Sequence, residues 1–411
     1  MEIKPIFSAL MRSKTGPILV AVQVALSLAI LANALHIVSV RQAVAARPTG
    51  IANEELVFSL RVRPLNQGGH EEQLATQKAQ AAALRAVPGV VSVADTIQVP
   101  LSNSGNYSSV AASREQERTN ASPSMYITPD SLVKTWGLKI IDGRDFTPQD
   151  VPEIDQNKSK DFPTVALITK AVGDKVWPDA PSFVGKKMYY GTGPEAREVT
   201  VVGVIETLQT PGAAMGAEGE MSTMVPARLT GSGRNMYTVR TEPGQRDRAM
   251  KDAEEALRKL HNGKVVIRAT TQSEERVKRY RADNALSWML ITVSVLLMMV
   301  TASGIVGMAS LWVTQRRKQI GVRRALGARK LDILRYFVTE NVLITTTGIA
   351  GGLMGALGLN QLLVSKLELA RLPAEYMVFG AAAFWTLGIA AVYGPAWRAA
   401  SISPALATRS A

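Results

Sequence analysis

The chain of 411 residues has a formal net charge of +13, a hydrophobic fraction of 46% and no cysteine, which excludes disulfides and thiolate metal sites. Its charge is concentrated, because residues 1–16 carry +2, residues 314–336 carry +7 and residues 398–411 carry +2. A nucleic-acid-binding protein spreads its basic residues over one folded face. Basic segments beside long apolar runs are instead typical of cytoplasmic loops of integral membrane proteins. The composition therefore predicts a membrane protein that contacts lipid and does not bind nucleic acid.

The first forty residues predict a surface helix followed by a membrane span. Residues 1–16 place apolar and basic side chains at helical spacing, as in an amphipathic helix on the cytoplasmic membrane face; the charged start of a signal peptide is the alternative. Residues 17–40 contain no charged residue, and about 20 apolar residues suffice to cross a bilayer. We therefore expect residues 17–40 to form an uncleaved transmembrane helix, with His36 near the outer interface.

Residues 41–283 predict one large α+β domain outside the cytoplasm. Helical patterns at 71–87 and 246–260 alternate with apolar strand-like runs, which is typical of mixed folds. The strand-like runs are Val57–Val62, Val90–Val99, Thr164–Ile168 and Glu198–Ile205. Two stretches rich in small and polar residues, Ser102–Asn120 and Thr207–Ser222, predict loops.

The C-terminal part predicts three further membrane spans. A charged helix at 271–283 leads into residues 284–313, whose apolar run is longer than one bilayer crossing and favours a continuous stalk. The third span is predicted at 337–364, the outer loop at 365–375, the fourth span at 376–397 and a cytoplasmic tail at 398–411. The predicted fold is four transmembrane helices with the α+β domain between the first and second, and both termini in the cytoplasm.

The third span carries glycines at helix-packing spacing. Gly348 and Gly352, and likewise Gly351 and Gly355, lie four residues apart. Small residues at this spacing let helices approach closely in lipid. The alternative is that transmembrane helices are generally rich in glycine.

The sequence contains no recognisable catalytic or metal-binding pattern. The histidines His36, His70 and His261 are scattered without metal-ligand spacing. There is no phosphate-binding loop, no nucleophile elbow and no H-E-x-x-H motif. The glycine-containing segments at Gly191 and Gly231 are interpreted as turns. We therefore predict that the chain is not an enzyme and holds no metal or cofactor.

The basic segment 314–336 is expected to face the cytoplasm. Its basic motif consists of Arg316, Arg317, Arg323 and Arg324. Glu340 follows as the single acid in the otherwise apolar third span. It could form an intramembrane ion pair with an arginine such as Arg335 or Arg323. It could equally be a first-turn acid favoured by the helix dipole.

The segment RRKQIGVRRALGARKLDILRYFVTENVLI, at 316–344, resembles the signature of FtsX-like permeases, the MacB-type mechanotransmission branch (type VII) of ABC transporters. Gln319 departs from the family, which commonly has Glu there. The tail at 395–409 resembles the family's C-terminal motif, and the segments at 126–147 and 165–206 resemble its MacB-like periplasmic core domain.

The resemblance implies a permease subunit in the bacterial inner (plasma) membrane, with its large domain in the periplasm. It implies a coupling helix that docks on a cytoplasmic ABC ATPase, made of Gly327, Ala328, Arg329, Lys330, Leu331, Asp332, Ile333 and Leu334. ATP and Mg would be bound by that ATPase partner. A second permease copy or a paralogue would complete a dimer, and a periplasmic adaptor and an outer-membrane channel are further candidate partners.

The resemblance implies that ATP-driven conformational change exports a drug, a peptide or another amphiphile. Two other functions fit the same architecture. One is FtsX-like signalling across the membrane to a periplasmic partner. The other is extraction of lipoproteins from the inner membrane.

Overall fold

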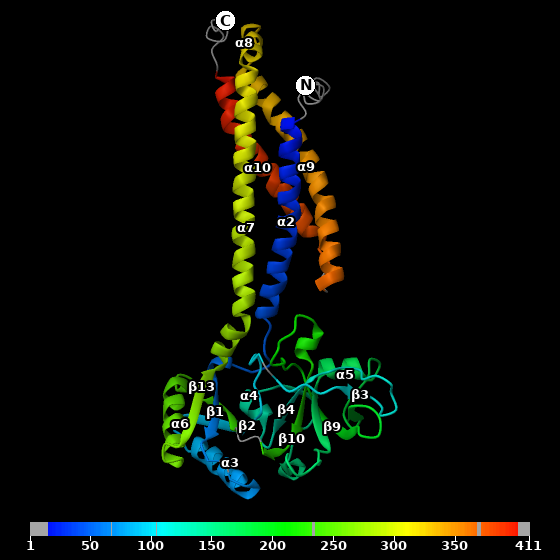
Figure 1. Ribbon diagram of the computed structural model, residues 1–411, viewed down its shortest axis with the longest axis vertical. Helices are drawn as coiled ribbons and strands as arrows, with labels where there is room; N and C mark the ends of the chain where they lie inside the picture. Colours follow the sequence, from blue (N-terminus) through cyan, green and yellow to red (C-terminus); the bar gives the residue numbers. More distant parts are fainter. Residues whose placement is uncertain (1–14, 67, 104, 232–234, 368–370, 402–411) are drawn as a thin grey trace. The chain divides into compact units, whose positions relative to one another are not determined.

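The computed structural model describes residues 15–66, 68–103, 105–231, 235–367 and 371–401 (Figure 1). The chain divides into two compact units, one made of residues 1–43 and 283–411 and the other of residues 44–282. Most of the predicted amphipathic helix at 1–16 and most of the tail at 398–411 lie outside the described residues.

Four helices of the described chain are long and apolar enough to cross a membrane: α2 (Thr15–Ala45), α7 (Gln272–Gln315), α9 (Lys330–Leu367) and α10 (Ala374–Ala400). The short helix α8 (Arg317–Ala325) lies between α7 and α9. Helix α7 has 44 residues, which corresponds to about 66 Å of helix, against a hydrocarbon core of about 30 Å. The predicted continuity of the charged segment with the second span is confirmed, since both belong to α7.

Helix α9 differs from its predicted extent. It begins at Lys330 rather than near residue 337, so the second half of the predicted coupling helix and the third span form one helix. Asp332 explains the early start, because its carboxylate accepts a hydrogen bond from the Arg329 backbone N–H at 2.9 Å. An acid in this position satisfies a free N–H and complements the helix dipole.

Close approach between α2 and α9 depends on two of the four glycines predicted for helix packing. A Cβ atom on Gly348 would lie 2.7 Å from the Ala21 carbonyl oxygen, and one on Gly352 would lie 3.0 Å from the Ala25 carbonyl oxygen. At Gly351 and Gly355 the nearest atoms would be alanine methyl groups at 3.5 and 3.4 Å, which is ordinary contact. Gly348 and Gly352 therefore leave no room for a side chain.

Buried polar contacts also connect the membrane helices. Ser27 and Thr301 share a hydrogen bond of 2.9 Å between α2 and α7. The Asn33 side-chain amide donates to the Ala356 carbonyl of α9 at 3.1 Å. His36, expected at the interface, is only 6% exposed, and its ring centroid lies 5.3 Å from that of Tyr376 in α10. Such contacts satisfy polar groups where lipid offers no partner.

The first part of the unit at 44–282 is an antiparallel sheet with the order β13-β1-β12-β2. Its strands are β1 (Val57–Pro64), β2 (Val90–Asp95), β12 (Asn235–Thr241) and β13 (Val265–Thr271). Helices α3 (His70–Arg85) and α6 (Arg246–Leu260) connect the outer strands to the inner ones and share a buried core with one face. Two β-α-β units in this order make a ferredoxin-like split arrangement.

The second part is inserted between β2 and β12 and is built on a mixed seven-stranded sheet. That sheet contains β3 (Val110–Ala111), β4 (Ser124–Thr128), β5 (Ile140–Gly143), β7 (Val165–Thr169), β8 (Lys187–Tyr190), β9 (Arg197–Ile205) and β10 (Ser222–Pro226). A small parallel pair, β6 (Glu153–Asp155) with β11 (Arg228–Thr230), accompanies it, as do helices α4 (Leu132–Trp136) and α5 (Lys170–Val176). The remaining helical turns are η1 (Glu54–Leu56), η2 (Pro148–Asp150) and η3 (Ala217–Glu220). The prediction of an α+β domain is confirmed.

Helix α4 joins the two parts. Trp136 is fully buried, and its indole N–H donates to the Thr238 hydroxyl of β12 at 2.8 Å. Its ring meets that of Tyr126 of β4 edge-on at a centroid distance of 5.5 Å. Val57 and Met236 from the first sheet belong to the same apolar cluster as these rings. The two sheets therefore share one core through α4.

A cluster of charged side chains lies where the chain leaves the first sheet, at the end of β2. The backbone N–H of Asp95 donates to the Asp130 carboxylate at 2.9 Å, and Arg85 pairs with Asp130 at 2.9 Å. The Arg228 guanidinium lies 3.9 Å from the Asp95 carboxylate. Burial raises the pKa of Asp95 to about 7; Arg228 opposes this shift and Asp130 adds to it. Asp95 therefore titrates near neutral pH.

We expect Asp95→Asn to remove a pH dependence of stability. The raised pKa means that the folded chain binds the proton more tightly than the unfolded chain, so wild-type stability falls as the pH rises from about 4 to about 7. The variant should exceed wild type by about 4 kcal/mol at pH 8 and nearly match it at pH 4. Hydrogen exchange of the β2 amides at the two pH values measures this. An identical pH slope in both proteins would contradict the assignment.

We expect Gly348→Ala to loosen the α2–α9 contact, because the new methyl group would meet the Ala21 carbonyl oxygen and Val24 Cβ at 2.7 and 2.8 Å. Overpacking of this kind costs about 1–3 kcal/mol, which a lowered thermal midpoint of the detergent-purified protein would show. Gly358→Ala is the matched control, since nothing lies within 4 Å of its Cβ position. Equal midpoints for the two variants would refute the close-approach role of Gly348.

Candidate functional site

The basic segment folds into a helix and a tight turn between α7 and α9. Helix α7 ends at Gln315, and Arg316 caps the next helix while its own backbone N–H still donates to the Trp312 carbonyl at 3.0 Å. Helix α8 then carries Arg317, Arg323 and Arg324 of the predicted basic motif. Ile320 is the buried anchor of α8, with 4% exposure.

Gly327 ends α8 in a conformation that favours glycine. Its φ is +95°, which strains any residue with a side chain. Its N–H donates to the Arg324 carbonyl at 3.2 Å, and the Ala328 N–H donates to the Arg323 carbonyl at 3.1 Å. This pair of bonds is the Schellman motif. Because Asp332 caps α9 directly afterwards, the backbone of the turn is fixed from both sides.

The turn exposes apolar side chains among basic ones. Leu326 is 83% exposed and Leu331 is 56% exposed, and Val322 on α8 is 51% exposed. The residues predicted for coupling differ in exposure. Five of them are exposed: Gly327, Arg329, Lys330, Leu331 and Asp332. Two are half-buried, Ala328 and Leu334, and one is buried, Ile333. The predicted coupling set, which the family resemblance implies, does not include Val322 and Leu326, because the sequence alone does not show which apolar residues are exposed.

Glu340 pairs with Arg316. One guanidinium nitrogen of Arg316 lies 2.9 and 2.8 Å from the two carboxylate oxygens of Glu340. The carboxylate is 1% exposed and the arginine side chain 18%. The expectation of an ion pair is therefore met by a different arginine than Arg335 or Arg323. The helix-dipole alternative is wrong, because α9 starts at Lys330 and places Glu340 beyond its first turn.

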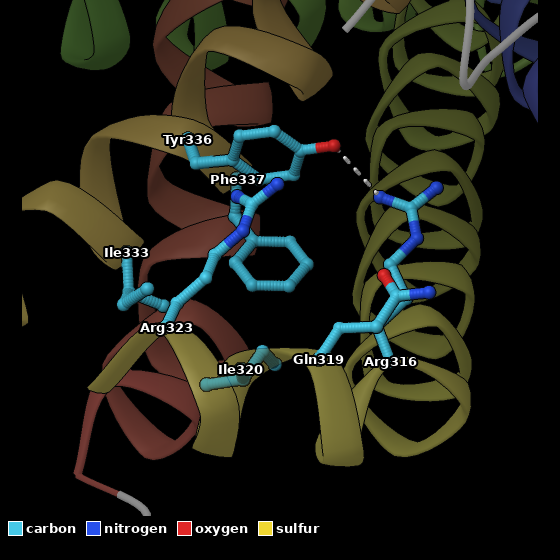
Figure 2. A pocket seen from close by; sticks show the side chains of 7 residues that line it. All are labelled: Arg316, Gln319, Ile320, Arg323, Ile333, Tyr336 and Phe337. Atoms are coloured by element: carbon cyan, nitrogen blue, oxygen red, sulfur yellow. Dashed lines mark hydrogen bonds between the residues drawn. The ribbon is translucent and has the colours of Figure 1, made fainter. Parts of the chain in front are cut away.

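Aromatic residues surround this ion pair. The Arg316 guanidinium also donates to the Tyr336 hydroxyl at 3.4 Å, as Figure 2 shows. The guanidinium carbon of Arg323 lies 5.1 Å from the centre of the Tyr336 ring, within the range of cation–π attraction. The cavity between these groups measures about 20 Å³, which is room for about one water molecule. It is lined by Arg316, Gln319, Ile320, Arg323, Ile333, Tyr336 and Phe337. The site is thus a packed joint between helices and not a substrate pocket.

The described part of the chain contains no cluster of metal-ligating side chains. The histidines lie apart from one another. His70 shares a hydrogen bond of 2.7 Å with the Thr230 hydroxyl, and His261 shares one of 2.7 Å with the Gln80 amide. Both contacts are structural.

Arg316→Ala is expected to destabilise the protein more than Glu340→Ala. Loss of Arg316 leaves a carboxylate with 1% exposure unpaired, and breaking a buried pair costs about 3–5 kcal/mol. Loss of Glu340 leaves an arginine that water still reaches. The double variant Arg316→Met/Glu340→Leu should recover most of the loss, while the exposed control Arg317→Ala should change nothing. Thermal midpoints in detergent test the order, and a double variant less stable than both single variants would overturn it.

Two families match the chain. Residues 24–260 match the MacB-like periplasmic core domain, and residues 291–404 match the FtsX-like permease C-terminal family. The FtsX-like match includes both the joint around the Arg316–Glu340 pair and the turn between α8 and α9.

Known relatives match more than half of the chain. The chain is 31% identical over 256 residues to the pyoverdine export ATP-binding/permease protein PvdT of Pseudomonas savastanoi pv. phaseolicola, covering 60% of this chain and 38% of that protein. It is 28% identical over 298 residues to the macrolide export ATP-binding/permease protein MacB of Neisseria gonorrhoeae, covering 70% of this chain and 43% of that protein. The chain thus spans less than half the length of these curated relatives.

Among solved structures, the extracellular domain of the ABC-type transporter YknZ from Gram-positive bacteria is 18% identical, with a TM-score of 0.32. The match covers 51% of this chain and 99% of that domain. The periplasmic-core match alone covers more than half of the sequence, and the FtsX-like match covers three of the four apolar helices in whole or in part. The chain therefore belongs to the MacB-type family of ABC transporter permeases, with a MacB-like periplasmic core domain and an FtsX-like C-terminal region.

Proposed function

We propose that this chain is a permease subunit that couples ATP hydrolysis by a cytoplasmic ATPase partner to conformational change of its periplasmic domain, and so exports an amphiphile. The observation that carries the proposal is the turn between α8 and α9. It presents Leu326 and Leu331 with 83% and 56% exposure on a backbone that is fixed by hydrogen bonds on both sides.

Two features of the turn suit docking on a protein partner. Large exposed apolar side chains on a rigid backbone fill a groove at low entropic cost. The exposed basic side chains Arg317, Arg323, Arg329 and Lys330 surround them, and would orient the partner through an acidic rim. By the positive-inside rule, the same basic residues favour a cytoplasmic position for this turn. In this proposal ATP and Mg are bound by the ATPase partner.

The joint would pass movement of the turn to the periplasmic domain. A push on α8 reaches α7 through the peptide chain at Arg316 and reaches α9 through the Arg316–Glu340 pair. Helix α7 is continuous for 44 residues and follows directly after strand β13. A single helix transmits axial movement more faithfully than a flexible linker. We therefore assign α7 the role of the transmitting element.

We further propose that the protein resides in the bacterial inner membrane, with both termini in the cytoplasm, and works as a dimer with a second copy or a paralogue. A periplasmic adaptor and an outer-membrane channel would extend its export path. Both curated relatives are named as export proteins, one for pyoverdine and one for a macrolide. Their names favour export of an amphiphile over FtsX-like signalling or lipoprotein extraction.

Leu326→Asp/Leu331→Asp should abolish association with the ATPase without affecting membrane insertion, since both side chains are exposed and contribute little to the fold. The measurement is vanadate-sensitive ATPase activity retained on the tagged permease after purification from native membranes in mild detergent. Leu260→Asp, on a residue 42% exposed on α6, is the control and should retain the activity. Full retention of ATPase activity by the double variant would disprove the docking role of the turn.

A further inference from the structure

One face of the sheet β13-β1-β12-β2 is only partly covered. On this face, Val57, Ala94 and Met236 are buried in the core that the sheet shares with α4 and the inserted part. On β13 and the second half of β1 the same face exposes Arg61, Arg63 and Arg268, although Met236 of β12 is the register partner of Arg61 on its other side. Val266 lies among them with 57% exposure. We call Arg61, Arg63, Val266 and Arg268 the basic edge.

The basic edge places like charges directly opposite each other. In the antiparallel pairing of β1 with β13, Arg61 is the register partner of Arg268, and Arg63 is the partner of Val266. Like charges in such positions destabilise a sheet. Arg61 has an acidic neighbour in Glu275, at 3.9 Å. Arg63 and Arg268 form no ion pair within the part of the chain that the structure describes. No carboxylate of the described residues therefore offsets the charge of Arg268 at ion-pair distance.

The outer strand of this sheet is also open. β13 is the last strand in the order, and within the described residues it pairs with β1 alone. Its seven residues contain neither proline nor a bulge that would block further pairing. An open strand edge offers backbone N–H and C=O groups to an extended chain, which is the basis of β-strand addition.

We propose that the basic edge binds an extended acidic segment of a partner protein, which pairs with the free edge of β13. Alternate residues of such a segment face the same side of the sheet, so carboxylates at every second position would line up beside Arg268 on β13, with Arg61 one strand further in. Guanidinium groups bind carboxylates through paired hydrogen bonds. Val266 lies two residues before Arg268 on the same strand and supplies an apolar contact beside it. A lipid headgroup could use the charges but not the strand edge, and therefore fits less of the surface. This assignment is independent of ATPase docking, because it rests on the sheet alone.

The test uses the full chain in nanodiscs of neutral lipid and a fluorescent nine-residue peptide of alternating Glu and Val. Fluorescence anisotropy should show binding that weakens as salt is added. Arg61→Gln/Arg268→Gln should weaken binding by about tenfold or more. Arg248→Gln/Lys251→Gln removes two exposed charges from α6 and should bind like wild type. A peptide of the same composition with its Glu residues in one block should bind more weakly than the alternating one.

A second measurement separates a binding role from a structural one. Arg268→Thr should leave the thermal midpoint unchanged or raised, because it relieves the repulsion with Arg61, while it weakens peptide binding. The proposal is overturned if the midpoint falls and peptide binding is retained. It is also overturned if both charge-removal variants bind equally, if the block peptide binds as well as the alternating one, or if anionic nanodiscs abolish binding through the same arginines.

Discussion

Glu340 is almost fully buried on an apolar helix, and its charge is tolerated because Arg316 reaches it from the end of α7. An unpaired carboxylate in that place would cost several kcal/mol, so the pair constrains where α7 ends relative to α9. Tyr336 and Arg323 complete the joint by a hydrogen bond and a cation–π contact. The joint fixes helix α8 relative to α7 and α9. The exposed turn that follows α8 is therefore fixed as well. The proposed docking surface thus depends on an ion pair whose carboxylate is buried away from that surface.

The start of α9 and its middle are fixed by different interactions. At the turn, the backbone N–H groups of Gly327 and Ala328 donate hydrogen bonds, and the Asp332 carboxylate accepts one from the Arg329 N–H. Within the lipid, where the hydrophobic effect does not drive helix association, Gly348 and Gly352 let α2 approach to contact distance instead. These contacts connect the helices of the bundle directly. This is the property that the proposed transmission along α7 requires.

Much of the architecture could be predicted from the sequence, because the signals concerned are local. Apolar run length located the four spans, and helical periodicity with a glycine stop located α6 at its observed bounds. The start of α9 was misplaced, since capping by Asp332 is a weaker signal than the beginning of an apolar run. The partner of Glu340 was also missed. Arg316 is 24 residues away, and only the fold around α8 brings it closer than Arg335 or Arg323.

The sequence patterns do not predict which strands pair when those strands are far apart in the chain. β2 and β12 are neighbours in one sheet although the whole inserted part separates them in the chain. The ferredoxin-like order follows from that pairing, and the opposition of Arg61 to Arg268 follows from the equally distant pairing of β1 with β13. An alternating pattern shows that a strand exists but does not name its neighbour. The basic edge is consequently a property of the fold and not of any one segment.

The most direct test of the coupling account uses the lack of cysteine in the chain. A single cysteine at Met215 would carry an environment-sensitive fluorophore in a loop that Arg279 of α7 holds through the Gly212 carbonyl at 2.7 Å. With the ATPase partner bound, trapping by ATP and vanadate should change the fluorescence. The same addition should have no effect in the Leu326→Asp/Leu331→Asp background. A wild-type complex with no change, or a change that persists in the variant, would contradict transmission from the turn to the periplasmic domain.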